Sequence, residues 1–364
     1  MIRSRYTTAD FDHSPFLVFY EVTRACDLVC AHCRACAQPR AHPSELDTTA
    51  SMRLIEDLAS FPAAPLLVLT GGDPLKRADL DQLIRHARKL GLTVAMSPSA
   101  TPLVTVDALA RLHDAGVSRI AMSLDGVDAH THDSFRGVPG SYELTRTIMK
   151  QIRAQDISLQ VNTTITTRNV DQVDAIAELL ADEDVALWSV FFLVPVGRGL
   201  AEQRIAPERY EQVFEQLHAH ARRQPYAIKT TEAPHYRRFV MRRGGDPLAG
   251  GTHTPMRAPL GVNDGRGVMF VSHVGQVFPS GFLPIDCGRF PQRSVVDIYQ
   301  NAPVFRELRD VTQLKGKCGA CRFNTVCGGS RARAYALTRD HLAPERDCTY
   351  IPDAWLPELK RCSA

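Results

Sequence analysis

Residues 15–36 read P-F-L-V-F-Y-E-V-T-R-A-C-D-L-V-C-A-H-C-R-A-C, an apolar run followed at once by a loop that holds four cysteines. The run at 15–22 predicts a buried β-strand, because strands covered on both faces read as continuous apolar stretches. Cys26, Cys30 and Cys33 then have the spacing C-x3-C-x2-C. Three thiolates on one short loop can hold three irons of a 4Fe–4S cube and leave the fourth iron without a protein ligand. An open metal position is typical of catalytic sites.

A zinc site is the alternative for this loop. Zinc normally takes four ligands grouped as C-x2-C pairs, and His32 is badly placed to complete such a set. The cysteine count favours metal ligation over disulfides, because a disulfide-stapled fold would not leave the long middle of the chain without cysteine. The ten cysteines are at positions 26, 30, 33, 36, 287, 318, 321, 327, 348 and 362.

The cysteine loop opens an alternation of short apolar strands with amphipathic helices. This alternation predicts parallel β/α units. The six expected strands are fewer than the eight of a closed barrel, so the fold class is α/β with a partial (β/α)6 barrel. After the first strand, we expect strands at 65–70, 93–97, 118–124, 158–164 and 187–194, and helices at 48–60, 78–90, 106–114, 141–154 and 170–181.

The alternation stops near Gly197. Residues 203–224 look helical, 225–260 irregular, 268–279 like a hairpin that turns at Val274-Gly275, and 295–309 helical again. We therefore expect three parts: a barrel at 1–196, a linker and helical region at 197–255, and a smaller C-terminal domain at 256–364.

The composition excludes several classes of protein. A net charge of +3 with no dense Lys/Arg run argues against nucleic-acid binding. No apolar stretch is long enough to predict a membrane span, and the N-terminal residues have no apolar signal-peptide core. We expect a cytoplasmic protein with no membrane or nucleic-acid partner.

The strand, the cysteine loop and the G-G-D-P sequence at 71–74 together resemble the radical S-adenosylmethionine (AdoMet) superfamily over about residues 14–195. The resemblance implies an oxidoreductase in which AdoMet chelates the open iron of a 4Fe–4S cluster. It further implies reductive cleavage of AdoMet to a 5′-deoxyadenosyl radical, which removes a hydrogen atom from the substrate. A flavodoxin or ferredoxin is the implied electron donor.

The same resemblance implies AdoMet contacts by position. Gly71, Gly72 and Asp73 match the motif that receives the methionine amino group, although Asp stands where Glu is commoner. Contact is then expected mostly through backbone carbonyls, and a plain β/α turn is the alternative. Ser123, at the end of the fourth strand, and Arg136, in H-D-S-F-R, match positions that contact the ribose or carboxylate of AdoMet. A structural or helix-capping role is equally open for both.

Val194, just after the sixth strand, matches a position at the edge of the adenine. Outside the triad, Cys36 is expected to be a spectator, with a reactive thiol near the cluster as the alternative. Cys287 and Cys362 have no assigned partner and are expected to be free, although the loop of Cys287 can face the active site.

A second group of cysteines stands near the C-terminus. Cys318, Cys321, Cys327 and Cys348 have the spacing C-x2-C-x5-C-x20-C and can saturate one cluster or a structural zinc ion. The region resembles the auxiliary-cluster domain called SPASM, or its shorter form twitch. Ser330 and Ser280 occupy two positions that are cysteine in the full pattern, so the resemblance implies one auxiliary 4Fe–4S cluster, suited to electron transfer, and two clusters in all.

Three further segments, at 193–199, 279–284 and 327–336, look most like enzymes that finish modified haems. This implies oxidative decarboxylation of a small molecule that bears carboxylates, such as an iron-coproporphyrin. Arg198, Arg331 and Arg333 are candidates to pair with those carboxylates, or else to bind backbone carbonyls and acidic side chains. His235 and His253 are candidates to contact substrate or a haem iron, with a surface position as the simpler alternative.

Other substrates stay open. Relatives with this architecture also form crosslinks or thioethers in ribosomally made peptides, or modify sugars and nucleosides, and a zinc-binding structural protein is the non-enzyme alternative. Only about 14 residues precede the first strand, fewer than a leader-binding domain needs, which favours a small molecule over a peptide.

Overall fold

The computed structural model describes residues 6–248 and 258–355, and within them nine strands form one sheet. The order is β7-β6-β5-β4-β3-β2-β1-β8-β9, and every neighbouring pair is parallel except β8 and β9. β7 and β9 are the two edges, so the sheet does not close on itself. The strands are β1 (Leu17–Thr23), β2 (Leu66–Gly71), β3 (Thr93–Met96), β4 (Val117–Ser123), β5 (Ser158–Ile165), β6 (Leu187–Phe192), β7 (Ala227–Thr231), β8 (Val268–Val271) and β9 (Val277–Phe278).

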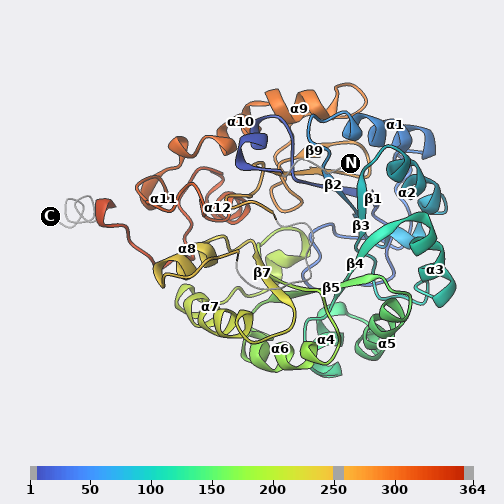
Figure 1. Ribbon diagram of the computed structural model, residues 1–364, viewed down its shortest axis with the longest axis horizontal. Helices are drawn as coiled ribbons and strands as arrows, with labels where there is room; N and C mark the ends of the chain where they lie inside the picture. Colours follow the sequence, from blue (N-terminus) through green and yellow to red (C-terminus); the bar gives the residue numbers. More distant parts are fainter. Residues whose placement is uncertain (1–5, 249–257, 356–364) are drawn as a thin grey trace.

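Helices α1 to α7 surround the strands, and α8, α11 and α12 lie together on one side of the molecule (Figure 1). The α-helices are α1 (Thr48–Ala59), α2 (Leu80–Lys89), α3 (Val106–Ala115), α4 (Ala129–Arg136), α5 (Ser141–Ala154), α6 (Val173–Ala181), α7 (Pro207–Ala221), α8 (His235–Arg242), α9 (Val295–Asn301), α10 (Pro303–Arg309), α11 (Gly316–Gly319) and α12 (Arg331–Thr338). The 3-10 helices are η1 (Thr8–Asp12), η2 (Pro74–Lys76), η3 (Val170–Gln172), η4 (Gly197–Ala201), η5 (Val311–Gln313) and η6 (Asp353–Trp355). No helix in the described residues is both long and apolar enough to cross a membrane.

The main core lies between the sheet and the outer helices. Helix α2 is an example of how a helix contributes to this core. Its buried residues are Leu80, Leu83, Ile84 and Ala87, and their spacing places them on one face of the helix. Strand β5 alternates instead, and its buried residues pack outward against the helices while Asn162 and Thr164 line a cavity on the other face. The inner face of the sheet is therefore free to build a site.

The six predicted parallel strands are confirmed, but the sheet extends further at both edges. The prediction of an irregular stretch at 225–260 was wrong for β7 and α8. Strand β7 pairs with β6, and its short sequence A-I-K-T-T has too few apolar residues to stand out as a strand. The predicted hairpin at 268–279 is present, with β8 and β9 antiparallel, and β8 also pairs in parallel with β1.

The helices differ from the sequence prediction in two places. Helix α4 was not predicted, although Asp128 caps its first turn by accepting a hydrogen bond from the backbone N–H of Thr131 at 2.8 Å. The helix expected at 295–309 is two helices, α9 and α10, separated at Ala302. Pro303 has no backbone N–H to continue α9, so it begins a new helix instead.

Candidate active site and a second cysteine cavity

A cavity with about 1080 Å³ of empty space, part of it open to solvent, lies at the carboxyl ends of the strands. Its walls come from the cysteine loop, the turn after β2 and the ends of β3 to β6. Parallel α/β sheets place their ligands at this end. Residues from all of the predicted site segments of the barrel meet here: Cys26, Cys30, Cys33, Gly71, Gly72, Ser123, Arg136 and Val194.

Two of the three thiols accept hydrogen bonds from backbone N–H groups. The backbone N–H of Leu28 donates to Cys26 Sγ at 3.4 Å, and that of Ala37 donates to Cys33 Sγ at 3.5 Å. Such donors favour the thiolate, which is the form that binds metal. Burial acts in the opposite direction and raises the pKa of the Cys26 thiol. A metal bound by Cys26 would have to displace the thiol proton.

The third thiol faces a buried ion pair. The guanidinium of Arg136, at the end of α4, donates to Cys30 Sγ at 3.7 Å and pairs with the fully buried Asp125. Burial opposes ionisation of Asp125, but Arg136, two nearby histidines and a backbone N–H together outweigh it and hold the pKa of that carboxyl below its usual value. Arg136 therefore contacts a cysteine thiol directly, and its charge is already partly balanced by protein.

The segment after β6 holds the cysteine loop from the opposite side. Arg198 donates from Nε to the carbonyl of Cys30 at 2.8 Å and from Nη1 to the carbonyl of Ala37 at 3.2 Å. Its own backbone N–H donates to the carbonyl of Cys33 at 3.0 Å. Of the two alternatives for Arg198, the structure gives binding to backbone carbonyls.

The turn after β2 packs directly against the backbone of the cysteine loop. Gly71 and Gly72 line the cavity, whereas Asp73 is fully buried away from it. The Asp73 carboxylate accepts hydrogen bonds from Thr101 Oγ1 at 2.7 Å and from the backbone N–H of Leu75 at 3.2 Å. The side chain of Asp73 thus fixes the turn, and the backbone of the two glycines is what the turn presents to the cavity.

Gly72→Ala should displace the cysteine loop, because an added Cβ would lie 2.3 Å from the carbonyl oxygen of Ala25 and 2.6 Å from that of Arg24. Overpacking of this kind costs about 1–3 kcal/mol of stability. We expect a lower melting temperature and reduced iron binding after anaerobic reconstitution. Gly199→Ala is the matched control, since its Cβ would meet neighbours at ordinary contact distances of 3.4 Å or more. Equal iron content in both variants would contradict the steric role of Gly72.

Several cavity residues were not found from the sequence. Phe191 and Phe282 form an aromatic wall, with ring centroids 6.1 Å apart, although Phe282 comes from the loop after β9. Arg34 also lines the cavity and pairs with the buried Glu21 at 3.1 Å. Asn162, Thr164 and Phe191 could have been found, because they stand at the ends of predicted strands. Nothing in the local sequence predicts that Phe282 reaches this cavity.

His32 lies between two of the cysteines and also lines the cavity. Burial lowers the pKa of His32 to about 4, so the imidazole is neutral. Its Nδ1 is buried and has no hydrogen-bond partner in the described residues. A buried polar atom without a partner at the cavity wall is typical of a place where a ligand completes the site.

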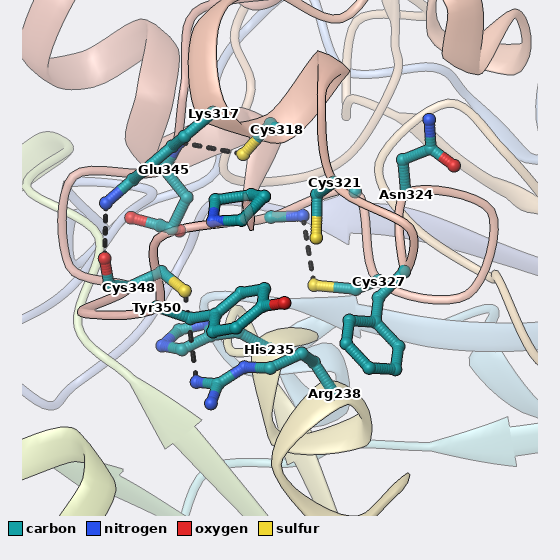
Figure 2. Close-up of a pocket in the computed structure, with 14 residues that line it drawn as sticks. His235, Arg238, Lys317, Cys318, Cys321, Asn324, Cys327, Glu345, Cys348 and Tyr350 are labelled. Atoms are coloured by element: carbon teal, nitrogen blue, oxygen red, sulfur yellow. Dashed lines mark hydrogen bonds between the residues drawn. The ribbon is translucent and has the colours of Figure 1, made fainter. Parts of the chain in front are cut away.

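A second cavity, with about 370 Å³ of empty space, lies between α8 and the C-terminal loops (Figure 2). All four predicted cysteines of the second group line it: Cys318, Cys321, Cys327 and Cys348. In residues 6–248 and 258–355, no three His, Cys, Asp or Glu side chains stand together as a site for a single metal ion. The four thiols line the wall of a cavity.

Every thiol of this second group has a nearby N–H donor, as in the first cavity. Burial raises the pKa of Cys321, Cys327 and Cys348, and these donors partly oppose that effect. The donors are the backbone N–H of Glu345 to Cys318 at 3.3 Å, that of Phe323 to Cys321, that of Gly329 to Cys327 at 3.4 Å and the guanidinium of Arg238 to Cys348 at 3.8 Å.

The two serines at the expected cysteine positions are both buried. Ser330 caps α12, with its Oγ accepting from the backbone N–H of Arg333 at 3.0 Å and donating to Glu232 at 2.5 Å. The Oγ of Ser280 accepts from the backbone N–H of Phe282 at 3.2 Å. Each hydroxyl therefore has a protein partner of its own.

The two C-terminal arginines are likewise used inside the protein. Arg331 donates to the carbonyls of His341 at 3.0 Å and Ala343 at 2.8 Å. Arg333 is fully buried and pairs with Glu345 at 2.9 Å. Of the two alternatives for these arginines, the structure gives binding to backbone carbonyls and an acidic side chain, which buried guanidinium groups need.

Of the alternatives for His235, the surface position is wrong. His235 is 1% exposed and lines the second cavity, not the first. An isolated histidine followed by four arginines within eight residues gave no sequence signal of burial. His253 lies outside the described residues.

The nine described cysteines are free thiols, and Cys362 lies outside the described residues. Cys36 and Cys287 line neither of the two cavities. The Cys287 thiol donates to the carbonyl of Ile285 at 3.4 Å, and burial raises its pKa to about 12, which keeps it protonated.

Comparison with known proteins agrees with this geometry. Residues 20–180 match the family described as the Radical SAM superfamily. An "AdoMet-dependent heme synthase" of Methanosarcina barkeri is 38% identical over 343 residues, covering 93% of this chain and 98% of the relative. A "Pre-heme d1 synthase" of Dinoroseobacter shibae is 31% identical, covering 91% of this chain and 85% of the relative. A "Mycofactocin maturase MftC" of Mycobacterium ulcerans is 28% identical, covering 93% and 89%.

Solved structures agree on the fold. SuiB from Streptococcus suis, in a crystal structure with S-adenosylmethionine, superposes with a TM-score of 0.70 at 14% identity, covering 93% of this chain and 78% of SuiB. The superfamily match, the identity along almost the whole chain and the three-cysteine cavity at the strand ends lead to one conclusion. This chain belongs to the radical SAM superfamily of enzymes, which use a 4Fe–4S cluster and AdoMet.

Proposed function

We propose that this enzyme oxidatively modifies carboxylate-bearing side chains of a tetrapyrrole, with decarboxylation as the reaction. The observation that supports this best is the 38% identity to a named heme synthase over nearly the full length of both chains. The peptide maturase cited above is less similar, at 28%. Tetrapyrrole chemistry is thus the better-supported proposal, and peptide modification becomes an outcome of the test.

The first cavity fits the cofactors of the superfamily. Cys26, Cys30 and Cys33 supply three thiols, two with backbone N–H donors and one with a guanidinium donor, and the neighbouring His32 has an unpartnered nitrogen. We propose that they hold a 4Fe–4S cluster. When bound, the cluster and AdoMet supply a 5′-deoxyadenosyl radical.

The AdoMet contacts are proposed from the lining of the same cavity. The backbone at Gly71 and Gly72 receives the methionine end, and Ser123, Arg136 and Val194 contact the rest of the molecule. Asp73 acts through the turn that it fixes, because its carboxylate already bonds Thr101 and the backbone of Leu75.

The remaining walls suit a flat, partly apolar substrate with acidic groups. Phe191 and Phe282 provide aromatic surface, and such rings bury large apolar areas. Arg34 also lines this cavity; its guanidinium pairs with Glu21 at 3.1 Å and lies over the ring of Phe270, and we propose that it also binds a substrate carboxylate, as guanidinium groups do well. Apolar walls also keep water away from the reacting groups.

We further propose that Cys318, Cys321, Cys327 and Cys348 hold one auxiliary 4Fe–4S cluster in a C-terminal domain that begins near residue 256. Four protein ligands leave no iron open, so this centre would serve electron transfer. Because β8 and β9 extend the barrel sheet, this domain is joined to the barrel through strand pairing. We also propose a flavodoxin or ferredoxin as the electron donor. A cytoplasmic location is part of the proposal, since both cysteine groups require reducing conditions.

The test is anaerobic reconstitution followed by incubation with AdoMet, dithionite and iron-coproporphyrin. We expect 5′-deoxyadenosine and a porphyrin product that has lost carbon dioxide, both detected by mass spectrometry. If 5′-deoxyadenosine forms at the same rate with and without the porphyrin, and the porphyrin mass is unchanged, the proposed substrate class is wrong. A peptide substrate would then be the next to examine.

A further inference from the structure

His235 is a buried residue without a polar partner in the part of the chain that the structure describes. It begins α8, is 1% exposed, and neither Nδ1 nor Nε2 has a hydrogen-bond partner. The rings of Tyr210 and Phe214 pack against it, with centroids 5.3 and 4.9 Å away. Neither ring nitrogen is satisfied by these neighbours in the described residues, so an acceptor has to come from elsewhere.

The open side of the imidazole is the second cysteine cavity. His235 lines that cavity together with the four thiols, and Figure 2 shows it on the same side as Cys348 and Arg238. Burial, with Arg333 and Arg238 nearby, lowers the pKa of His235 well below its usual value, so the ring is neutral. A neutral imidazole has one N–H donor, and leaving that donor buried and unpaired is destabilising.

Positive charge gathers at the same wall. Arg238 is 2% exposed, donates to Cys348 Sγ at 3.8 Å and keeps its Nε without a partner in the described residues. Lys317 lines the cavity and donates to the backbone carbonyl of Cys348. Glu211 pairs with Arg238, and Glu345 is the acidic residue among those that line the cavity. The cavity wall therefore combines two cations with the unpaired imidazole.

We propose that His235 donates its N–H to a sulfur of the auxiliary cluster and, together with Arg238, raises the reduction potential of that cluster. The inference rests on the proposed auxiliary cluster. Reduction adds negative charge to the iron–sulfur centre, and hydrogen bonds and cations near the sulfurs stabilise that charge. His235 is then a positioning and tuning residue, and the four cysteines remain the ligands.

The experiment uses the full chain with Cys26, Cys30 and Cys33 all replaced by alanine, so that the auxiliary cluster is the iron centre that remains. Its reduction potential is measured by redox titration followed by electron paramagnetic resonance. In His235→Phe we expect the one-electron reduction to become about tenfold less favourable, a downward shift of about 59 mV. His235→Gln, which keeps an N–H donor, should recover most of the shift.

His218→Phe is the control, because His218 lies on α7, packs against Phe239 and does not line the cavity. It should leave the potential unchanged. An unchanged reduction potential in His235→Phe would overturn the inference. Loss of the cluster from both His235 variants would also overturn it, because His235 would then be a ligand or a structural residue. If the triple-cysteine protein binds no iron at all, the auxiliary cluster itself is wrong, which is a separate and recognisable failure.

Discussion

Cys30→Ala is expected to abolish 5′-deoxyadenosine formation while leaving the fold intact. The Cys30 thiol is half-buried at the cavity wall, and removing it leaves two thiols on a loop that needs three. Iron content after reconstitution should fall from about eight to about four per chain, because the auxiliary cluster is retained. Activity is followed by chromatography of dithionite-reduced samples, and iron by a colorimetric assay.

Cys36→Ala is the matched control for this change. Cys36 lies three residues after Cys33 in the same loop but does not line the cavity. Its backbone has a positive φ of 48°, which alanine would share without further strain. We expect Cys36→Ala to keep iron and activity. If Cys30→Ala and Cys36→Ala lose iron and activity to a similar extent, the claim that Cys30 is a cluster ligand and Cys36 is not would be contradicted.

Cys321→Ala is expected to separate AdoMet cleavage from product formation. The Cys321 thiol belongs to the second cavity, which lies apart from the cysteine triad and shares no lining residue with the first cavity. Loss of this ligand should remove the auxiliary centre and with it the route for the electron released by substrate oxidation. We therefore expect 5′-deoxyadenosine to form while decarboxylated porphyrin does not.

Cys287→Ala provides the comparison, because Cys287 is a partly buried thiol that lines neither cavity and donates to the carbonyl of Ile285. It should retain both products at the rate of the unchanged protein. Full yield of decarboxylated porphyrin from Cys321→Ala would contradict the electron-transfer role of the second group.

The central sheet was predictable because its signals are local. Strands β1, β2, β3 and β6 are mostly apolar runs, β5 alternates apolar with polar residues, and α2 buries residues at regular helical spacing, so each of these elements could be recognised from its own residues. Strand β7 failed this criterion because it is a half-exposed edge strand of five residues. The pairing of β8 with β1 joins segments about 250 residues apart in sequence, and no local pattern records it.

The candidate site, like the sheet, has parts that the local sequence predicts and parts that it does not. The cysteine spacing and the paired glycines are contiguous motifs, and the structure brings their residues to the expected cavities. The arginines were harder, because what a guanidinium binds depends on the rest of the fold. Arg198 binds the carbonyl of Cys30, 168 residues away, and Arg333 binds acids and carbonyls from three segments. His235 was named as a candidate, but its place in the second cavity likewise depends on the rest of the fold.

The central claim is that Cys26, Cys30 and Cys33 hold a cluster with one iron open to AdoMet. Electron paramagnetic resonance of the reduced Cys321→Ala protein tests it most directly, because the auxiliary centre no longer contributes. Addition of AdoMet should change the position and shape of the cluster signal, since a new ligand joins the open iron. A spectrum that stays the same at saturating AdoMet would contradict the claim.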